Sequence, residues 1–144
     1  MMPDDEVVIG SSSKRLSILF SHNINGETHP CGCRHHPLGG LTQVAGKMHQ
    51  LGKDSAGLIY IDTGDTFFPS SKIPKTVESS TKFIARQLAW ALDQQGLKFY
   101  LPGDQDFAAG AEFLKELGIE NGFQFVIANL KDESRKSFPS IQSK

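Results

Sequence analysis

The chain has 144 residues, of which 38% are hydrophobic, and its 15 Lys and Arg against 16 Asp and Glu give a formal net charge of −1. This length suits one domain of roughly 100–150 residues, and the balanced charge argues against nucleic acid or anionic membrane as partners attracted by bulk electrostatics. No apolar run approaches the roughly 18–20 residues that span a bilayer. The acidic start MMPDDEVVIGSSSKR lacks the pattern of a secretory signal, but removal of such a signal would leave localisation open.

The chain divides into three parts by composition. Residues 1–14 carry no periodic apolar pattern and predict a mobile lead-in. Residues 15–130 contain all the expected ordered elements and predict one α/β domain. Residues 131–144 return to polar loop character and predict a tail.

The first expected elements alternate between strand and helix. The apolar run RLSILF predicts a buried strand over residues 16–20, followed by a loop rich in Cys and His. Residues 40–52 predict a helix, because their apolar side chains recur at three- and four-residue intervals. These side chains are Leu41, Val44, Ala45, Met48 and Leu51. Residues 57–61 predict a second buried strand, which leads directly into the polar turn DTGD.

The second half of the chain repeats this order. Residues 77–92 predict a helix that ends near Gly96. Its expected buried stripe is Phe83, Ile84, Leu88 and Leu92, with Ala85 and Ala89 beside it. A strand over residues 97–101 and a helix in FAAGAEFLKELG follow. In this helix Phe113, Leu114 and Leu117 should point inward, with Gly118 at the C-terminal end. A last strand is expected over residues 123–128.

The order β-α-β-α-β-α-β predicts a mainly parallel sheet with βαβ crossovers. Ligands of open parallel sheets bind beyond the carboxyl ends of the strands, where polar residues gather here. They are His22, Asn23, Asn25, Asp62, Thr63, Asp65, Asp104, Gln105, Asp106 and Asn129. Their oxygens suit a hard cation such as magnesium, manganese or calcium. The alternative, which spacing alone favours, is that they make turns and helix caps.

Five ordered blocks of the sequence carry a family resemblance. LSILFSHNINGE, GGLTQVAGKMHQL, LIYIDTGDTFF, LKFYLPGDQDF and FQFVIANL resemble the amino-terminal half of the calcineurin-like metallophosphoesterases, and most of all their 5′-nucleotidase and cyclic-nucleotide phosphodiesterase branch. The resemblance covers about residues 15–130 and implies half of a metallophosphoesterase α/β sandwich. In that family the strands end in Asp-x-His, Gly-Asp and Gly-Asn-His, which hold two metal ions that activate a water for attack on phosphorus.

Carried over onto this sequence, the metal motifs of the family are degenerate. Asn23 stands at the position of the first Asp, and Asn25 at that of its His. Asp65 matches the metal-bridging Asp, whereas Asp104 replaces the Asn ligand and Gln105 replaces the His that protonates the leaving group. Gln105 exchanges no proton near neutral pH, so general acid help worth roughly 10²–10⁴ in rate is missing. We expect weak binding of magnesium, manganese or calcium at most.

The resemblance also implies a shortened chain. The family places further metal-binding histidines after the strand that ends near Asn129, and this sequence has no histidine after His49. We therefore expect a catalytically inactive, 5′-nucleotidase-like domain that binds a ligand or a protein. The alternative is a residual phosphoesterase whose site is completed by another chain or by missing C-terminal sequence. A third reading is a truncated product whose function lies in that missing sequence.

The same resemblance predicts partners and location. A half-domain leaves part of its sheet uncovered, which favours self-association or binding of another protein. Helix starts after the first and third strands offer backbone amides to a nucleotide or phosphate, although ordinary capping is the reading that we favour. Relatives with a similar CGC and PLGGL sequence are often exported, so a periplasmic location is expected from the resemblance.

A dense group of cysteines and histidines occupies residues 21–36. Cys31, Cys33, His35 and His36 offer the thiolate and imidazole ligands that zinc prefers. The usual spacing is Cys-x2–4-Cys, however, and a mutual disulfide across one residue would be strained. The alternatives are a zinc site in one chain, a disulfide or metal bridge between chains, and a plain exposed loop, which the spacing favours.

Overall fold

The structure is a computed structural model that describes residues 16–35, 37, 39–53 and 56–127. The predicted lead-in and tail lie outside these residues. The strands and α-helices are β1 (Leu16–Ser21), α1 (Leu41–Lys53), β2 (Gly57–Asp62), α2 (Glu78–Gln94), β3 (Leu97–Tyr100), α3 (Ala111–Asn121) and β4 (Gln124–Phe125). Two short 3-10 helices, η1 (Lys75–Val77) and η2 (Gln105–Phe107), were not predicted. Within the described ranges, no helix combines the length and apolar character needed to cross a bilayer.

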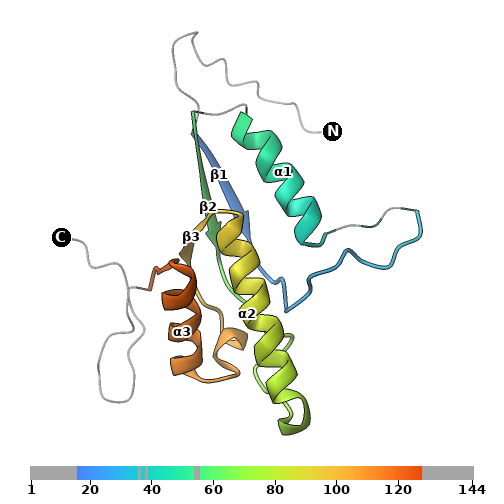
Figure 1. Cartoon of the computed structure of the whole chain (residues 1–144), viewed down its shortest axis with the longest axis vertical. Coiled ribbons are helices and arrows are strands. Elements are labelled where there is room, and N and C mark those ends of the chain that lie inside the picture. Colours follow the sequence, from blue (N-terminus) through green and yellow to red (C-terminus); the bar gives the residue numbers. More distant parts are fainter. Residues whose placement is uncertain (1–15, 36, 38, 54–55, 128–144) are drawn as a thin grey trace, which may run out of the picture.

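The four strands form one parallel sheet in the order β1-β2-β3-β4 (Figure 1). Each pair of neighbouring strands is joined by a helix, because parallel neighbours need a crossover connection. The predicted α/β fold with βαβ crossovers is confirmed. β1 and β2 pair along their whole length, from Leu16 opposite Gly57 to Ser21 opposite Asp62. Their carboxyl ends therefore lie side by side.

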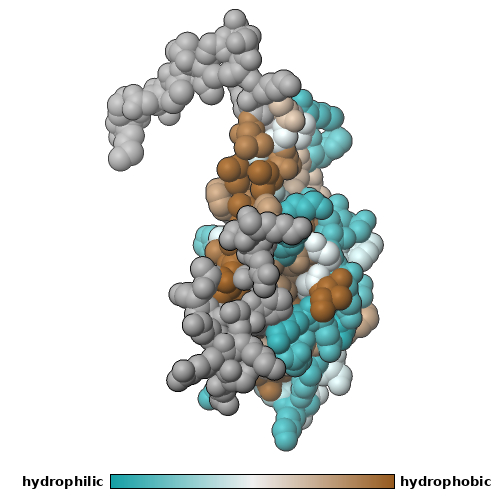
Figure 2. All heavy atoms as spheres, turned by 90° about the vertical axis from the view of Figure 1, so that its left-hand side faces the viewer, coloured by the Kyte–Doolittle hydropathy of each residue, from teal (hydrophilic) through white to brown (hydrophobic). Residues whose placement is uncertain are grey.

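The two faces of the sheet differ sharply in burial. Side chains of β1 alternate, so that Leu16, Ile18 and Phe20 point away from the helices and are exposed. The helices cover the other face, where Tyr60 and Tyr100 belong to the core. Figure 2 shows hydrophobic side chains gathered on the side of the molecule that lies to the left in Figure 1. Among the residues that the structure describes, the helices thus cover the inner face of the sheet and leave apolar side chains of its outer face exposed.

The buried stripe of α2 differs from the prediction. Phe83 and Ile84 are 63% and 44% exposed, so their predicted burial is wrong. The buried residues are Ala85, Leu88, Ala89 and Leu92, which recur at intervals of three and four. Phe83 precedes Ala85 by two positions, about 200° around the helix axis, and therefore faces outward. Small alanines face the core instead of the bulky pair.

The end of α3 also differs from the prediction. Gly118 does not end the helix, which continues to Asn121 and stops at Gly122 with a left-handed φ of 73°. Gly118 instead lies against β4, where an added Cβ would stand 2.4 Å from Cε2 of the Phe125 ring. A glycine is needed there because α3 and the ring approach so closely. The predicted burial of Phe113, Leu114 and Leu117 is confirmed.

We predict that Gly118→Ala lowers the free energy of unfolding by about 1–3 kcal/mol, because the new methyl group overpacks against Phe125. Helix propensity alone would instead raise stability by about 1 kcal/mol. Gly46→Ala in α1 is the matched control, since nothing lies within 4 Å of a Cβ added there. Denaturant unfolding of both variants measures the difference. Equal stabilisation by the two alanines would contradict the packing argument.

Candidate functional site

The segment after β1 runs alongside the loop after β2. The backbone N–H groups of Asn23, Asn25 and Gly26 donate to carbonyl oxygens of that loop at 2.9, 2.9 and 2.8 Å. Asn23, Asn25 and Asp65 have positive φ angles of 53°, 55° and 54°. Asn and Asp tolerate this left-handed region better than other residues with a side chain. Local backbone demand thus explains part of why amides and a carboxylate occupy these positions.

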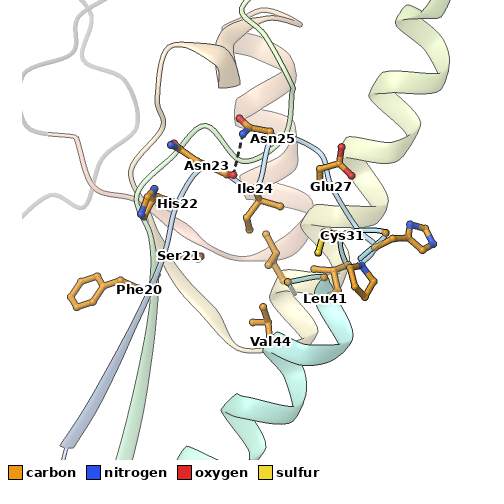
Figure 3. Close-up of a pocket in the computed structure, with 16 residues that line it drawn as sticks. Phe20, Ser21, His22, Asn23, Ile24, Asn25, Glu27, Cys31, Leu41 and Val44 are labelled. Carbon is orange, nitrogen blue, oxygen red and sulfur yellow. Dashed lines mark hydrogen bonds between the residues drawn. The ribbon is translucent and has the colours of Figure 1, made fainter. Parts of the chain in front are cut away.

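Three of the predicted site residues meet at the carboxyl ends of β1, β2 and β3. Gln105 donates from Nε2 to Oδ1 of Asn25 at 3.4 Å, and its backbone N–H donates to Oδ1 of Asp65 at 3.2 Å. Asn25 in turn donates from Nδ2 to the carbonyl oxygen of Asn23 at 3.1 Å (Figure 3). Oε1 of Gln105 is buried and accepts no hydrogen bond from any described residue. Hydrogen bonds therefore link the three residues of the cluster, and one buried acceptor in it stays unsatisfied.

Close approach of the β2 and β3 loops depends on glycine. A Cβ added to Gly103 would lie 2.1 Å from Oδ1 of Asp65, and one added to Gly64 would lie 2.3 Å from the nitrogen of Gly103. Asp104, the other carboxylate at a position of the family's metal motifs, is exposed and is the N-cap residue of η2. Asp65 is thus held inside the cluster, whereas Asp104 lies at its exposed edge.

Asp106 anchors the two loops to one another. Its carboxylate is fully buried and accepts four backbone N–H groups, with each oxygen accepting two. The donors are Asp65 at 2.8 Å, Thr66 at 2.9 Å, Phe67 at 3.0 Å and Gly103 at 2.9 Å. The sequence predicts Asp106 as one of the oxygen ligands for a cation. In the structure its four hydrogen bonds instead hold the backbone of the two loops. No local signal distinguished it from its neighbours Asp104 and Asp65.

A second buried carboxylate lies beneath the cluster. Asp62 accepts hydrogen bonds from the hydroxyl of Ser21, from Oγ1 of Thr66 at 2.5 Å and from the Gly64 N–H at 2.9 Å. Burial raises the pKa of Asp62, and the charge of Asp106 adds to this effect, while the donated hydrogen bonds oppose it. Burial also raises the pKa of Tyr60, whose hydroxyl lies 2.8 Å from Oγ of Ser21, to about 12.

A cavity of about 770 Å³ opens beside the cluster, between the segment after β1, the loop before α1 and the first turn of α1. In Figure 3, Asn23 and Asn25 lie in the upper part of the view with Ile24 just below them, and Leu41 and Val44 lie lower, on the side of α1. Glu27 and Cys31 also line the cavity. Its volume falls in the range of about 300–1,000 Å³ typical of small-molecule sites. It is a mixed apolar and polar site.

The predicted zinc ligands lie in the loop that borders this cavity. Cys31, Cys33 and His35 are exposed, and His36 lies outside the described residues. Among the residues that the structure describes, no three His, Cys, Asp or Glu side chains are grouped so that they could hold a metal ion. Metal binding at the loop and at the strand ends therefore stays a prediction.

Comparison with solved structures identifies the fold. A calcineurin-like phosphoesterase from Bacillus subtilis matches with a TM-score of 0.68 and 17% identity, and covers 87% of this chain. A 5′-nucleotidase precursor from Thermus thermophilus has a TM-score of 0.66, 16% identity and 84% coverage. The chain has the calcineurin-like phosphoesterase fold. A 5′-nucleotidase from Staphylococcus aureus, solved with α-ketoglutarate, also matches at 0.64, with 17% identity over 82% of this chain.

The chain is much shorter than the solved structures that share the calcineurin-like phosphoesterase fold with it. The chain spans 40%, 23% and 24% of the Bacillus, Thermus and Staphylococcus proteins. This agrees with the predicted likeness to an amino-terminal half. No family model matches the sequence, and no curated protein matches it. Structural likeness at 16–17% identity establishes the fold alone, and the activity must be argued from the residues themselves.

We predict that Asp106→Asn destabilises this fold by about 2–5 kcal/mol. The amide oxygen keeps two of the four donated bonds, and the new NH₂ group then faces two buried N–H donors, each costing about 1–3 kcal/mol when unsatisfied. The matched control is Asp104→Asn, an exposed neighbour whose replacement changes stability by less than about 0.5 kcal/mol. Denaturant unfolding measures both. Equal, small losses would show that Asp106 is not the anchor.

We predict a pH dependence of stability from Asp62. Because burial raises its pKa, the folded chain binds this proton more tightly than the unfolded chain. The stabilisation that protonated Asp62 contributes to the folded state is therefore fully present below the ordinary carboxyl pKa of about 3.9. It is lost as pH rises through the pKa of Asp62 in the folded chain. Asp62→Asn keeps an oxygen for Gly64 and Thr66 but does not titrate. The variant should gain stability relative to the native chain across this window, in unfolding measured at each pH. Parallel curves would contradict the assignment.

Proposed function

We propose that this chain is a non-catalytic binding module built on the calcineurin-like phosphoesterase fold, and that its ligand lies over the strand ends and in the adjoining cavity. The observation that carries this proposal is the cluster of Asn25, Asp65 and Gln105. Two neutral amides are bonded to each other there, at positions where the resemblance implies imidazole groups. The cluster is arranged to hold polar groups and lacks a group that exchanges protons near neutral pH.

Charge argues against a catalytic metal pair in this cluster. Asp65 brings one negative charge, and its Oδ1 already accepts the N–H of Gln105. Asp62 and Asp106 are buried and are held by donors from the loops. Amide oxygens ligate hard cations without neutralising them, and they do not replace imidazole for transition metals. Activation of a metal-bound water is therefore not expected from the described residues alone.

The lining of the cavity favours a ligand with a ring and hydroxyl groups. Ile24, Leu41 and Val44 supply apolar surface to this lining. Asn25 supplies a polar amide, and its Oδ1 accepts a hydrogen bond from Nε2 of Gln105. No described Lys or Arg lines the cavity, and Glu27 adds a negative charge at its wall. A phosphate would therefore gain little there. Of the predicted nucleotide and phosphate ligands, we favour a nucleoside moiety.

One observation favours a second candidate function. Asp65 and Asp104 keep carboxylates at the strand ends, as a residual metal-dependent phosphoesterase would require. Because the solved relatives are much longer than this chain, another chain or further sequence would have to complete such a site. This function predicts phosphodiester hydrolysis that depends on Asp65.

The two functions are separated by measuring binding and turnover on the same purified chain. Adenosine should bind in calorimetry, and AMP should bind no more tightly than adenosine. Gln105→Leu should weaken adenosine binding about tenfold, since it removes the hydrogen bond that positions Asn25, and a lost hydrogen bond costs about 1–2 kcal/mol. A chromogenic phosphodiester with excess manganese should show no turnover above that of buffer.

Matched variants control both measurements. Gln94→Leu, on the exposed side of α2, should leave adenosine binding unchanged. Turnover that disappears in Asp65→Ala but persists in Asp93→Ala would establish the phosphoesterase instead. Absence of both binding and turnover would refute the binding module.

A further inference from the structure

Two asparagines of this chain stand directly before a glycine. They are Asn25, in the segment after β1, and Asn121, the last residue of α3. Because glycine has no Cβ and reaches most backbone conformations, its nitrogen can approach Cγ of the preceding asparagine side chain. Asparagine is thermolabile, and hyperthermophilic proteins contain less of it. Each Asn-Gly pair is therefore a candidate for deamidation, and the fold decides which of the two reacts.

The end of α3 protects Asn121. Nδ2 of Asn121 donates to the carbonyl oxygen of Leu117 at 2.8 Å, and the N–H of Gly122 donates to that of Gly118 at 2.8 Å. Phe123, which follows this pair, is 4% exposed. Its ring centroid lies 5.4 Å from that of Tyr100. The helix end cannot open without exposing this ring, so the Gly122 nitrogen stays occupied.

The segment that carries Asn25 is held by less burial. The N–H of Gly26 donates to the carbonyl oxygen of Thr66 at 2.8 Å, but the bond from Nδ2 of Asn25 to the carbonyl oxygen of Asn23 is exposed (Figure 3). Ile24 is only partly buried. The left-handed φ of 55° at Asn25 is unfavourable for a residue with a Cβ, and opening relieves it. Segments with few buried contacts open most readily in a folded chain.

We propose that Asn25 is a site of deamidation in the folded chain and that Asn121 is not. When the hydrogen bond from Gly26 to Thr66 opens, the Gly26 nitrogen loses its proton and attacks Cγ of Asn25. The Cγ–Nδ2 bond breaks, and ammonia leaves with that proton. Water then opens the five-membered imide at one of its two carbonyl carbons and gives aspartate or isoaspartate. This inference does not depend on the proposed ligand.

Either product changes the candidate site. Oδ1 of Asn25 and Oδ1 of Asp65 both accept hydrogen bonds from Gln105, so the new carboxylate would lie near that of Asp65. Like charges this close repel each other. Isoaspartate also adds a methylene group to the main chain between the N–H groups of residues 25 and 26. These groups donate to the consecutive carbonyls of Asp65 and Thr66, and the longer spacing breaks that register.

The test is ageing of the full chain in warm, mildly alkaline buffer, followed by ion exchange and peptide mapping by mass spectrometry. A more acidic species should accumulate and carry its change at Asn25. The rate there should exceed the rate at Asn121 at least about tenfold, which corresponds to about 1.4 kcal/mol in opening free energy. In concentrated urea, where the fold holds neither pair, the two rates should agree within about twofold.

Matched variants assign the acidic species. Asn25→Gln, whose longer side chain would have to close a six-membered ring, should abolish it in the folded chain. Asn121→Gln is the control and should leave its rate unchanged. If circular dichroism shows that Asn25→Gln does not fold, amide hydrogen exchange of the native chain decides, because it should be faster at Gly26 than at Gly122.

Three results would overturn the proposal. The first is a folded chain that stays intact at Asn25 while the chain in urea deamidates. The second is an equal or faster rate at Asn121 in the folded chain. The third is a preference for Asn25 that persists in urea, since the flanking sequence and not the fold would then decide.

Discussion

The structure depends on one buried carboxylate, that of Asp106. By accepting four backbone N–H groups it ties the loop after β2 to the loop after β3, and it does so without exposure to water. Hydrogen bonds to a charged group are worth about twice those between neutral groups. Asp65 and Gln105 are positioned by the same two loops, so the arrangement of the candidate site follows from this anchor. Close approach at Gly64 and Gly103 makes the anchor possible.

The candidate site differs in character from the anchor beneath it. Asp62 and Asp106 are buried, whereas Asn25, Asp65 and Gln105 lie above them and are only partly buried. The upper residues bond to one another through amides, and Oε1 of Gln105 retains an acceptor. Two buried carboxylates thus stabilise the loops, whereas the groups above them are two neutral amides and the single carboxylate of Asp65. This division favours recognition over hydrolysis.

Periodicity predicted the order of elements and the parallel sheet, because short apolar runs and intervals of three and four are local signals. It failed where tertiary packing decides. Phe83 and Ile84 match a helical stripe as well as Ala85 and Ala89 do, and only the close packing of α2 shows which side faces inward. Gly118 has the sequence signature of a helix end. Its actual role is to leave room for the ring of Phe125 on β4, and the periodicity of the helix gives no sign of this contact. Asp106 carries no sequence mark of its anchoring role.

The candidate ligand site lies at an edge of the sheet and not on one of its faces. Helices cover the inner face, and the polar chemistry gathers at the carboxyl ends of the strands. Phe20 lines the cavity from β1, but its side chain is 61% exposed and points away from Leu41 and Val44 (Figure 3). The side chains that can meet a ligand therefore come from the segment after β1 and from the start of α1, so the loops that Asp106 ties together decide the shape of the site.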